Sequence, residues 1–135
     1  MTQEEKQLLL QDLCARLPYH TIVSTGEEDL ELVKVDILNG LVYVFSESFL
    51  EFDVSEIKPY LRPMSSMTEE EKRQYGKLCD EDIRQLTSVQ IVHPGLKYKT
   101  SCHRSIDWLN KNMFDYRRLI EKGLALEVSK GMYEY

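Results

Sequence analysis

The sequence predicts an α+β fold: an N-terminal helix, an antiparallel sheet of about five strands built from hairpins, and helices packed on one side of that sheet. Three observations predict it. Leucines recur at helical spacing near the N-terminus, alternating apolar residues flank Asn39 and Gly40, and a capped, acidic helix start follows residue 67. The 135 residues match the commonest size of one domain. We therefore expect residues 1–135 to form a single domain whose core needs no metal or disulfide.

The first predicted element is an amphipathic helix over residues 3–16. Thr2 and Glu5 have the spacing of a capping box, in which each side chain accepts a hydrogen bond from the other's backbone N–H. Apolar residues then recur every three or four positions, and Pro18 ends the helix soon after. The apolar face comprises Leu9, Leu10, Leu13, Cys14 and Leu17. On this face, we interpret Cys14 as a small buried hydrophobe rather than a reactive thiol.

The next segments predict strands. A short β-branched strand lies in YHTIVSTG, and LELVKVDILNGLVYVF has the pattern of a β-hairpin. In its first half Val33, Val35 and Ile37 alternate with polar residues, which is typical of a half-buried strand. Asn39 and Gly40 both tolerate positive φ, so they favour a type I′ turn.

The hairpin is followed by a further predicted strand and then by a connection. The segment SFLEFDV indicates a strand with Phe49 or Phe52 turned inward. Pro59 and Pro63 have fixed φ and push their preceding residues toward extended geometry, so residues 57–63 are expected to form a stiff connector.

Two interpretations of this connector remain open. Tyr60 and Arg62 are of types enriched at interface hot spots, and Met64 and Met67 would add an adaptable apolar rim. These four residues are therefore candidate partner-binding residues. The alternative, which we favour, is that Tyr60, Leu61 and Met64 fill the base of the sheet while Arg62 neutralises nearby acid.

The second half of the sequence predicts another helix, a hairpin and a last helical region. Thr68 and Glu71 form a second capping box before a helix over residues 69–85, which is expected to break near Asp80 because acidic residues cluster there. Val89 and Ile91 alternate as in a strand, and the following HPGL fits the type II turn of a second hairpin. Further helical turns are expected from Ser105 up to Gly123, followed by the extended segment LALEV.

Charge and cysteine usage bear on compartment and partners. The formal net charge of −6 is uneven: residues 1–67 contribute −7 and residues 68–135 contribute +1. Acidity repels a phosphate backbone, so nucleic acid is disfavoured as a general partner. Three widely spaced cysteines indicate reduced thiols in a cytoplasm. The start MTQEEKQLLL does not resemble a signal peptide, and no apolar run is long enough to span a membrane, so a cytoplasmic location without membrane contact is expected.

The search for chemistry yields one weak candidate. No Cys or His pair has metal-ligand spacing, so we expect no metal site and no cofactor. Cys102 and His103 lie in LKYKTSCHR, whose positive charges would favour a thiolate. They are weak candidates for a thiol-dependent enzyme. The alternative, which we favour, is a solvated strand edge or loop protected by lysines.

The same basic segment has a second functional interpretation. Lys97, Tyr98 and Lys99, with Arg104, would offer a stacking face flanked by positive charge for a nucleic acid. It is one short patch in an acidic protein, so they remain weak candidates for contact with nucleic acid.

Two segments, IKPYLRPMSSMTEEEKRQY and SIDWLNKNMFDYRRLIEKGLALEVSKGMY, together with LLLQDLCARLPY, resemble a family of short uncharacterised proteins. These occur in gut Bacteroides-type bacteria, in prophage or other mobile-element regions. The resemblance implies a bacterial or phage cytoplasmic origin and assigns no residue a role. With no catalytic constellation in the sequence, we expect a non-enzymatic accessory or interaction protein of a mobile element, with an unknown protein partner. A small thiol-dependent enzyme using Cys102 and a nucleic-acid-contacting modulator are the alternatives.

Overall fold

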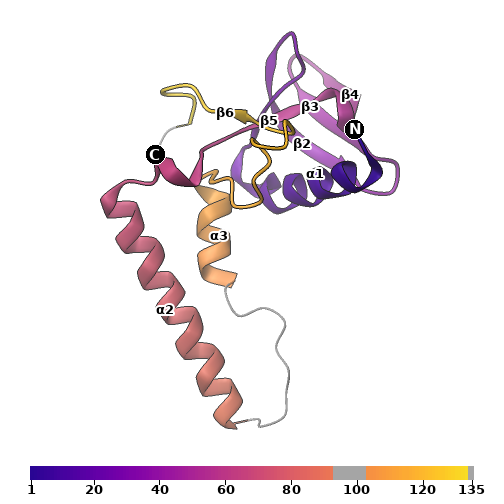
Figure 1. Ribbon diagram of the computed structural model, residues 1–135. Helices are drawn as coiled ribbons and strands as arrows, with labels where there is room; N and C mark the ends of the chain where they lie inside the picture. Colours follow the sequence, from indigo (N-terminus) through magenta and orange to yellow (C-terminus); the bar gives the residue numbers. More distant parts are fainter. Residues whose placement is uncertain (93–102, 134–135) are drawn as a thin grey trace. The chain divides into compact units, whose positions relative to one another are not determined.

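The structure of the protein is a computed structural model that describes residues 1–92 and 103–133, the side chains of residues 85–92 excepted (Figure 1). The chain forms two compact units. We call the first, Met1–Met64 with Asn110–Tyr135, the sheet unit, and the second, Ser65–Leu109, the helical unit. The fold is α+β, as the sequence predicts.

The sheet unit begins with helix α1 (Gln3–Arg16), which has the predicted bounds. Both bonds of the capping box form: Thr2 N donates to Glu5 Oε1 over 3.3 Å, and Glu5 N donates to Thr2 Oγ1 over 3.1 Å. The short 3₁₀ helix η1 (Leu17–Tyr19) follows, where Pro18 cannot donate the bond that would continue α1. The leucine stripe of α1 is buried as predicted, with Leu9 and Leu13 fully shielded from solvent.

A six-stranded sheet has the order β4-β3-β2-β1-β5-β6. Its strands are β1 (Ile22–Ser24), β2 (Asp29–Asp36), β3 (Leu41–Phe45), β4 (Phe49–Asp53), β5 (Lys58–Leu61) and β6 (Leu126–Glu127). All neighbours pair antiparallel except β5 and β6, which are parallel. The predicted antiparallel sheet is confirmed, and the predicted extended segment LALEV contains its last strand, β6. The 3₁₀ helix η2 (Val54–Glu56) links β4 to β5.

The predicted hairpin between β2 and β3 forms, but its predicted type I′ turn is wrong. Asp36 pairs with Leu41, which leaves a loop of residues 37–40. Gly40 has φ 67°, whereas Asn39 does not have positive φ. The Asp36 carboxylate accepts bonds from Asn39 N over 3.2 Å and from Asn39 Nδ2 over 2.8 Å, which stabilises the longer loop.

A β-bulge also changes which side chains of β2 face inward. The pairing with β3 shifts between Leu32 and Lys34, so Val33 has no partner residue. Leu32 is 2% exposed, while Val33 is 37% and Ile37 62% exposed. The predicted alternation of Val33, Val35 and Ile37 is therefore wrong for the two end residues. Only Val35 packs against the core.

The predicted connector over residues 57–63 contains a strand of the sheet. β5 lies between β1 and β6, with Pro59 opposite Val23 of β1. β6 pairs with Tyr60 and Leu61 only, so Pro59, which has no N–H, needs no second partner strand.

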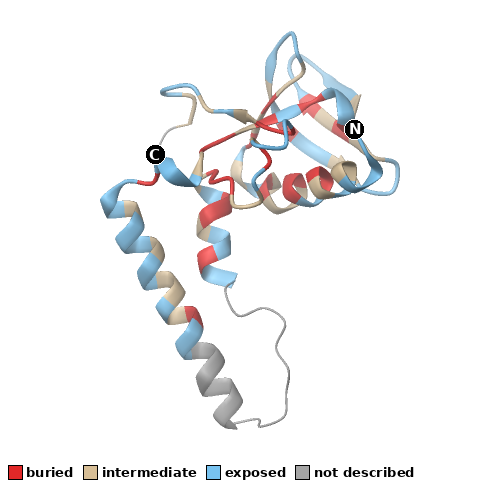
Figure 2. Cartoon of the chain, viewed as in Figure 1, coloured by how far each residue is buried: buried red, intermediate tan, exposed pale blue. Residues whose placement is uncertain are grey.

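The core of the sheet unit lies between the sheet, α1 and the C-terminal segment (Figure 2). Val42 and Val44 of β3 are fully buried. Of Phe49 and Phe52, one of which the sequence predicts to turn inward, Phe52 packs against the core. Further fully buried members are Leu9, Leu13, Val23, Val54, Ile57, Leu61 and Leu119.

The helical unit contains the 3₁₀ helix η3 (Met64–Ser66, which starts at the last residue of the sheet unit's first segment), α2 (Glu69–Val92) and most of α3 (His103–Lys111). The capping box is confirmed, since Thr68 N donates to Glu71 Oε1 over 3.0 Å and Glu71 N to Thr68 Oγ1 over 3.2 Å. The predicted strand at Val89 and Ile91 and the break near Asp80 are both wrong, because α2 continues to Val92. No Gly or Pro interrupts residues 77–92, so no helix-breaking residue stops α2 before Val92. The predicted HPGL turn lies outside the described residues.

Candidate interaction surface

Tyr60 and Arg62, two of the candidate partner-binding residues, are held in the sheet unit by specific contacts. Tyr60 is half-buried, and its hydroxyl donates to Asp29 Oδ1 over 2.8 Å. That bond, together with partial burial, raises the pKa of Tyr60. Arg62 is 6% exposed, and its guanidinium carbon lies 4.1 Å from the centroid of the Phe114 ring. The guanidinium of Arg62 is therefore not presented to solvent.

The backbone around Arg62 explains its burial. Arg62 N donates to Met113 O over 2.7 Å, and Arg62 O accepts from Asp115 N over 2.8 Å. Arg62, the residue after β5, and Phe114 thus form an isolated parallel β-bridge. Of the two predicted methionines, Met64 is 37% exposed and Met67, in the helical unit, is 9% exposed.

The predicted chemical candidates divide between described and undescribed residues. Cys102, Lys97, Tyr98 and Lys99 lie outside the described residues. His103 is exposed at the start of α3. Arg104 donates its backbone N–H to Asp82 Oδ1 over 3.3 Å, and its Nη1 lies 3.4 Å from Glu81 Oε2. Arg104 is therefore engaged with acidic side chains of its own unit.

Asp82 holds the first turn of α3 within the helical unit. Its Oδ2 accepts from Ser105 N over 3.0 Å and from Ser105 Oγ over 2.8 Å. Burial raises the pKa of Asp82, but the bonds from Ser105 and from the backbone of Arg104 outweigh it, so the pKa lies below its usual value. Tyr75 of α2 and Trp108 of α3 also stack, with ring centroids 5.9 Å apart.

Two free thiols lie in the described part of the chain. Cys14 and Cys79 are both half-buried, and burial raises the pKa of Cys14, which leaves it as a neutral thiol at pH 7. Within the described side chains, no group of three or more His, Cys, Asp or Glu residues is placed to hold a metal ion. None of the helices in the described part of the chain combines the length and hydrophobicity that crossing a bilayer requires.

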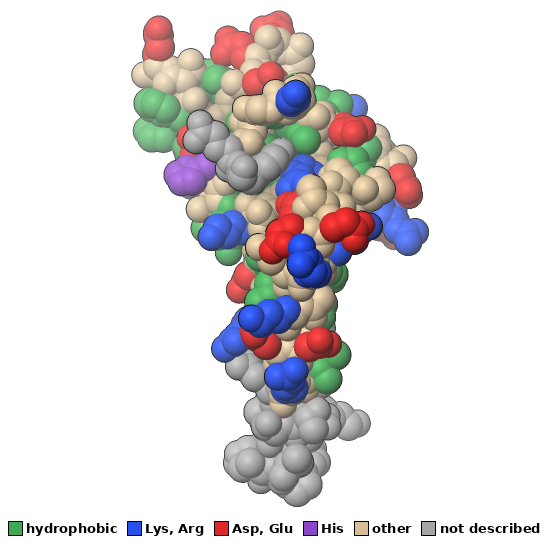
Figure 3. All heavy atoms as spheres, turned by 90° about the vertical axis from the view of Figure 1, so that its left-hand side faces the viewer, with side chains coloured by type: hydrophobic (Ala, Val, Ile, Leu, Met, Phe, Trp, Pro, Cys, Tyr) green, Lys and Arg blue, Asp and Glu red, His purple; other side chains and the backbone are tan. Residues whose placement is uncertain are grey.

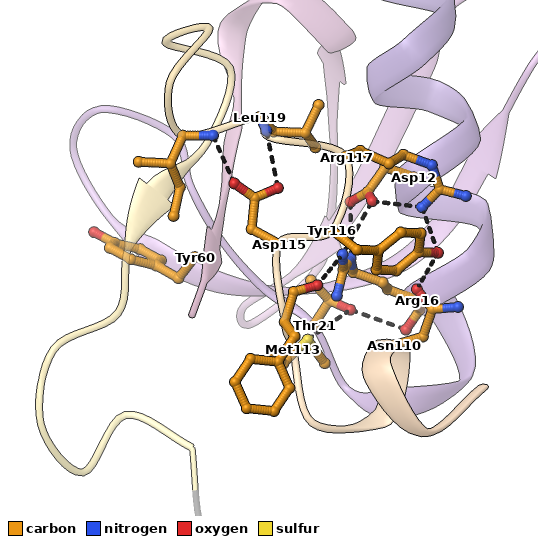
Figure 4. A network of polar contacts seen from close by, with 12 residues as sticks. Asp12, Arg16, Thr21, Tyr60, Asn110, Met113, Asp115, Tyr116, Arg117 and Leu119 are labelled. Carbon is orange, nitrogen blue, oxygen red and sulfur yellow. Dashed lines mark hydrogen bonds and ion pairs between the residues drawn. The ribbon is translucent and has the colours of Figure 1, made fainter. Parts of the chain in front are cut away.

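A buried polar network joins α1 to the C-terminal segment of the sheet unit (Figure 4). Arg16 Nε donates to Asp12 Oδ2 over 2.8 Å, and Arg16 Nη2 donates to Asp12 Oδ1 over 3.1 Å and to Phe114 O over 2.7 Å. Arg117 Nη1 lies 2.8 Å from Asp12 Oδ1 and donates to the Tyr116 hydroxyl over 2.6 Å. Tyr116 in turn donates to Asn110 Oδ1 over 2.8 Å. The network fixes the chain turn at 113–117 against the helix.

The sequence interpretation missed this network, although it carries a signal. Asp12 and Arg16 are one helical turn apart and are interleaved with Leu9 and Leu13 on the buried side of α1. Both are fully buried, and Arg16 Nη1 has no hydrogen-bond partner among the described residues. Neither Asp12 nor Arg16 lines the groove beside α1 or the hollow around His20 and Tyr133.

Among the described side chains, the most exposed aromatic pair lies on the β3–β4 hairpin. Phe45 and Phe49 are opposite one another in the ladder, 47% and 70% exposed, with ring centroids 5.3 Å apart and an interplanar angle of 61°. Leu50, the next residue of β4, is 38% exposed. We call these three residues the hairpin patch.

Charged and polar side chains continue the outer face of the same hairpin. Tyr43 donates to Glu51 Oε1 over 2.7 Å, and that bond, followed by burial and the carboxylate charge, raises the pKa of Tyr43. Lys34 Nζ lies 4.9 Å from the centroid of the Tyr43 ring. Asp53 at the end of β4 lies 3.9 Å from Lys6 of α1. The aromatic end of the hairpin is thus continuous with an acidic strand.

A separate groove lies between α1 and the β2–β3 loop. It encloses about 600 Å³ and is lined by Leu10 and Cys14 on the helix and by Ile37 and Leu38 on the loop. Leu38 is 95% exposed. The groove rim is formed by glutamines and by the paired Lys6 and Asp53, so it carries no net charge.

On the face drawn in Figure 3, acidic and basic side chains of the helical unit are interspersed. The helical unit has seven Lys/Arg and seven Asp/Glu, so the whole formal charge of −6 belongs to the sheet unit.

Comparison of the chain with known protein families, with curated protein sequences and with solved structures found no match.

Proposed function

We propose that this chain is a non-enzymatic accessory protein that binds a protein partner through the hairpin patch, in the cytoplasm of a bacterium that carries it on a prophage or other mobile element. The binding function rests on one observation: Phe45 and Phe49 form an aromatic pair that is largely exposed to solvent. The cellular setting is supported by the sequence resemblance and by the free thiols.

An exposed aromatic pair favours binding because its burial is energetically large. Covering a Phe side chain that was in water contributes about 1.5–3 kcal/mol. Aromatic residues are enriched at interface cores, and they lose little rotamer freedom when they are bound. Phe45 and Phe49 already pack edge to face, so their geometry is fixed before a partner arrives.

The described side chains give a binding function more support than an enzymatic one. Burial raises the pKa of Cys14, which disfavours the reactive thiolate. Asp12 and Arg16 are fully buried and are bonded to one another, so they are not presented to a substrate. The hairpin patch, by contrast, is accessible and presents groups suited to contact.

The test is capture of a partner by a pair of matched variants. Phe45→Ser with Phe49→Ser removes the aromatic pair, and Leu38→Ser removes an even more exposed apolar side chain elsewhere on the sheet unit. We expect wild type and Leu38→Ser to recover the same partner from host lysate, and the double variant to lose it at an unchanged melting temperature. Capture that survives in the double variant would overturn the proposal, and loss with Leu38→Ser alone would move the site to the groove.

A further inference from the structure

β4 is an edge strand, and its ladder with β3 fixes which of its backbone groups are open. Val54 N donates to Gly40 O over 2.9 Å at one end of the hairpin, and Ser46 N donates to Ser48 O over 3.1 Å at the other. Hydrogen-bonded pairs alternate with non-hydrogen-bonded pairs in an antiparallel ladder. The N–H and C=O groups of Phe49, Glu51 and Asp53 therefore point away from β3, toward the open edge.

Among the described residues, β4 itself carries no lysine, no proline and no bulge against pairing. Natural edge strands are shielded by lysine, proline, a bulge or a covering segment. β4 has the sequence FLEFD and pairs with β3 in continuous register. Phe49, Leu50 and Glu51 are all exposed. What β4 does carry is negative charge, and this decides what can pair with it.

A second copy of this chain is a poor partner for β4. Two β4 strands can pair antiparallel only if the open N–H and C=O groups of one strand face those of the other. Three registers meet this condition, with the two-fold axis at Leu50, Glu51 or Phe52. The second places Glu51 opposite itself and the third places Glu51 opposite Asp53, and like charges directly opposite one another destabilise a strand pair. The first pairs Phe49 with Glu51, but it brings Asp53 toward Glu47 of the hairpin turn and joins two sheet units that each carry a formal charge of −6.

We propose, resting on the protein-binding function above, that β4 takes up an extended segment of its partner as an additional antiparallel strand. The segment carries basic residues opposite Glu51 and Asp53 and an aromatic residue opposite Phe49. Its intervening residues are apolar, because they lie on the face of Leu50 and Phe52. The sheet unit, with ten Lys/Arg against 16 Asp/Glu, attracts such a segment as a whole.

The probe is an end-blocked peptide, Gly-Lys-Val-Lys-Val-Phe-Gly, with a control in which both lysines are glutamate. Amide hydrogen exchange reports the binding mode. We expect saturating peptide to slow exchange at Phe49 and Glu51 by about tenfold or more, because their N–H groups gain partners. Leu50, whose N–H already faces β3, should not change, and the glutamate peptide should protect neither residue.

Two substitutions at one position separate backbone pairing from charge. Glu51→Gln removes the charge but keeps the open N–H, whereas Glu51→Pro removes both without taking a bond from β3. We expect the Gln variant to bind the lysine peptide about threefold to tenfold more weakly than wild type, and the Pro variant at least about tenfold more weakly again. Glu121→Lys, an exposed charge change away from β4, should bind as wild type does or slightly more weakly.

The outcomes distinguish this inference from the proposed function. Unchanged exchange at Phe49 and Glu51 with peptide at about 1 mM overturns strand addition, even if Glu51→Pro fails to fold. Equal capture of the lysate partner by wild type and Glu51→Pro, with loss in Phe45→Ser/Phe49→Ser, overturns strand addition and leaves the proposed function standing. Unchanged capture by the double Phe variant overturns both.

Discussion

Asp12 and Arg16 form a bidentate ion pair that is fully buried within one turn of α1. The Nε–Oδ2 and Nη2–Oδ1 distances are 2.8 Å and 3.1 Å, and neither side chain is exposed. Arg16 also donates to Phe114 O, and Arg117 approaches the Asp12 carboxylate, so the pair makes contacts across 98 and 105 positions of the sequence. The pair is the main polar link between α1 and the C-terminal segment.

Removing one partner of this pair should destabilise the sheet unit strongly. We expect Asp12→Ala to cost about 3–5 kcal/mol, because it leaves the Arg16 charge buried without its carboxylate. The free energy of opening, measured by amide exchange of Val42 and Val44 in the core, checks this. Glu69→Ala breaks an exposed pair with Lys72 and should change stability by less than about 1 kcal/mol. Equal effects of the two substitutions would mean that the Asp12 pair is not buried in solution.

The helical unit should lose stability in acid through Asp82. Its native pKa is lowered, so the carboxylate stabilises the fold at pH above about 4, the unfolded pKa, and this contribution disappears as pH falls through the native pKa. Replacement by Asn should cost about 1–3 kcal/mol at pH 7 and flatten the acid dependence. Trp108 fluorescence, followed in urea at several pH values, measures both.

Asp80→Asn is the matched control, because Asp80 is exposed on the same helix. It should leave the acid dependence in place. A wild-type stability that does not fall below pH 4, or an Asp82→Asn variant with the same slope, would contradict the role of this carboxylate in holding α3.

Two glycines with open surroundings should respond to alanine in opposite directions. Gly40 and Gly76 each have nothing within 4 Å of an added Cβ, but Gly40 has φ +67° and Gly76 is helical. Gly40→Ala should destabilise the β2–β3 hairpin by about 1–2 kcal/mol through backbone strain. Gly76→Ala should stabilise α2 by roughly 0.5–1 kcal/mol. Melting temperatures that shift in the same direction would refute the loop geometry at Gly40.

Arg62 should behave as a structural residue. Arg62→Glu places a carboxylate over the face of Phe114 at a buried position, so we expect a loss of about 3 kcal/mol or more. Arg118→Glu, a charge reversal at an exposed position, should change stability by less than about 0.5 kcal/mol. Thermal unfolding followed by circular dichroism compares the two. An Arg62→Glu protein that melts with wild type would return Arg62 to the list of surface contact residues.

Elements defined by local chemistry were predictable from the sequence. The bounds of α1 follow from a capping box at Thr2 and a proline at position 18, and the start of α2 follows from Thr68 in the same way. The β2–β3 hairpin follows from its alternating pattern, because cross-strand partners are close in the chain.

Features that depend on distant residues were not predictable. The burial of Arg62 requires Phe114, and the third bond of the Asp12–Arg16 pair requires Phe114 O; both contacts join distant parts of the sequence. The bulge at Val33 shifts the register by one residue, which periodicity alone cannot reveal because Leu32 and Val33 are equally apolar. The exposure of Phe49 rather than Phe52 depends on the same long-range choice of face.

Site-specific photo-crosslinking at position 49 in the host cell tests the protein-binding function most directly. The natural side chain there is exposed and aromatic, so an aromatic photoreactive residue replaces it with little disturbance. We expect one dominant covalent adduct with another protein, which Phe45→Ser weakens. Adducts at position 49 no stronger than those from the same crosslinker at exposed Glu121 would contradict the binding function of the hairpin patch.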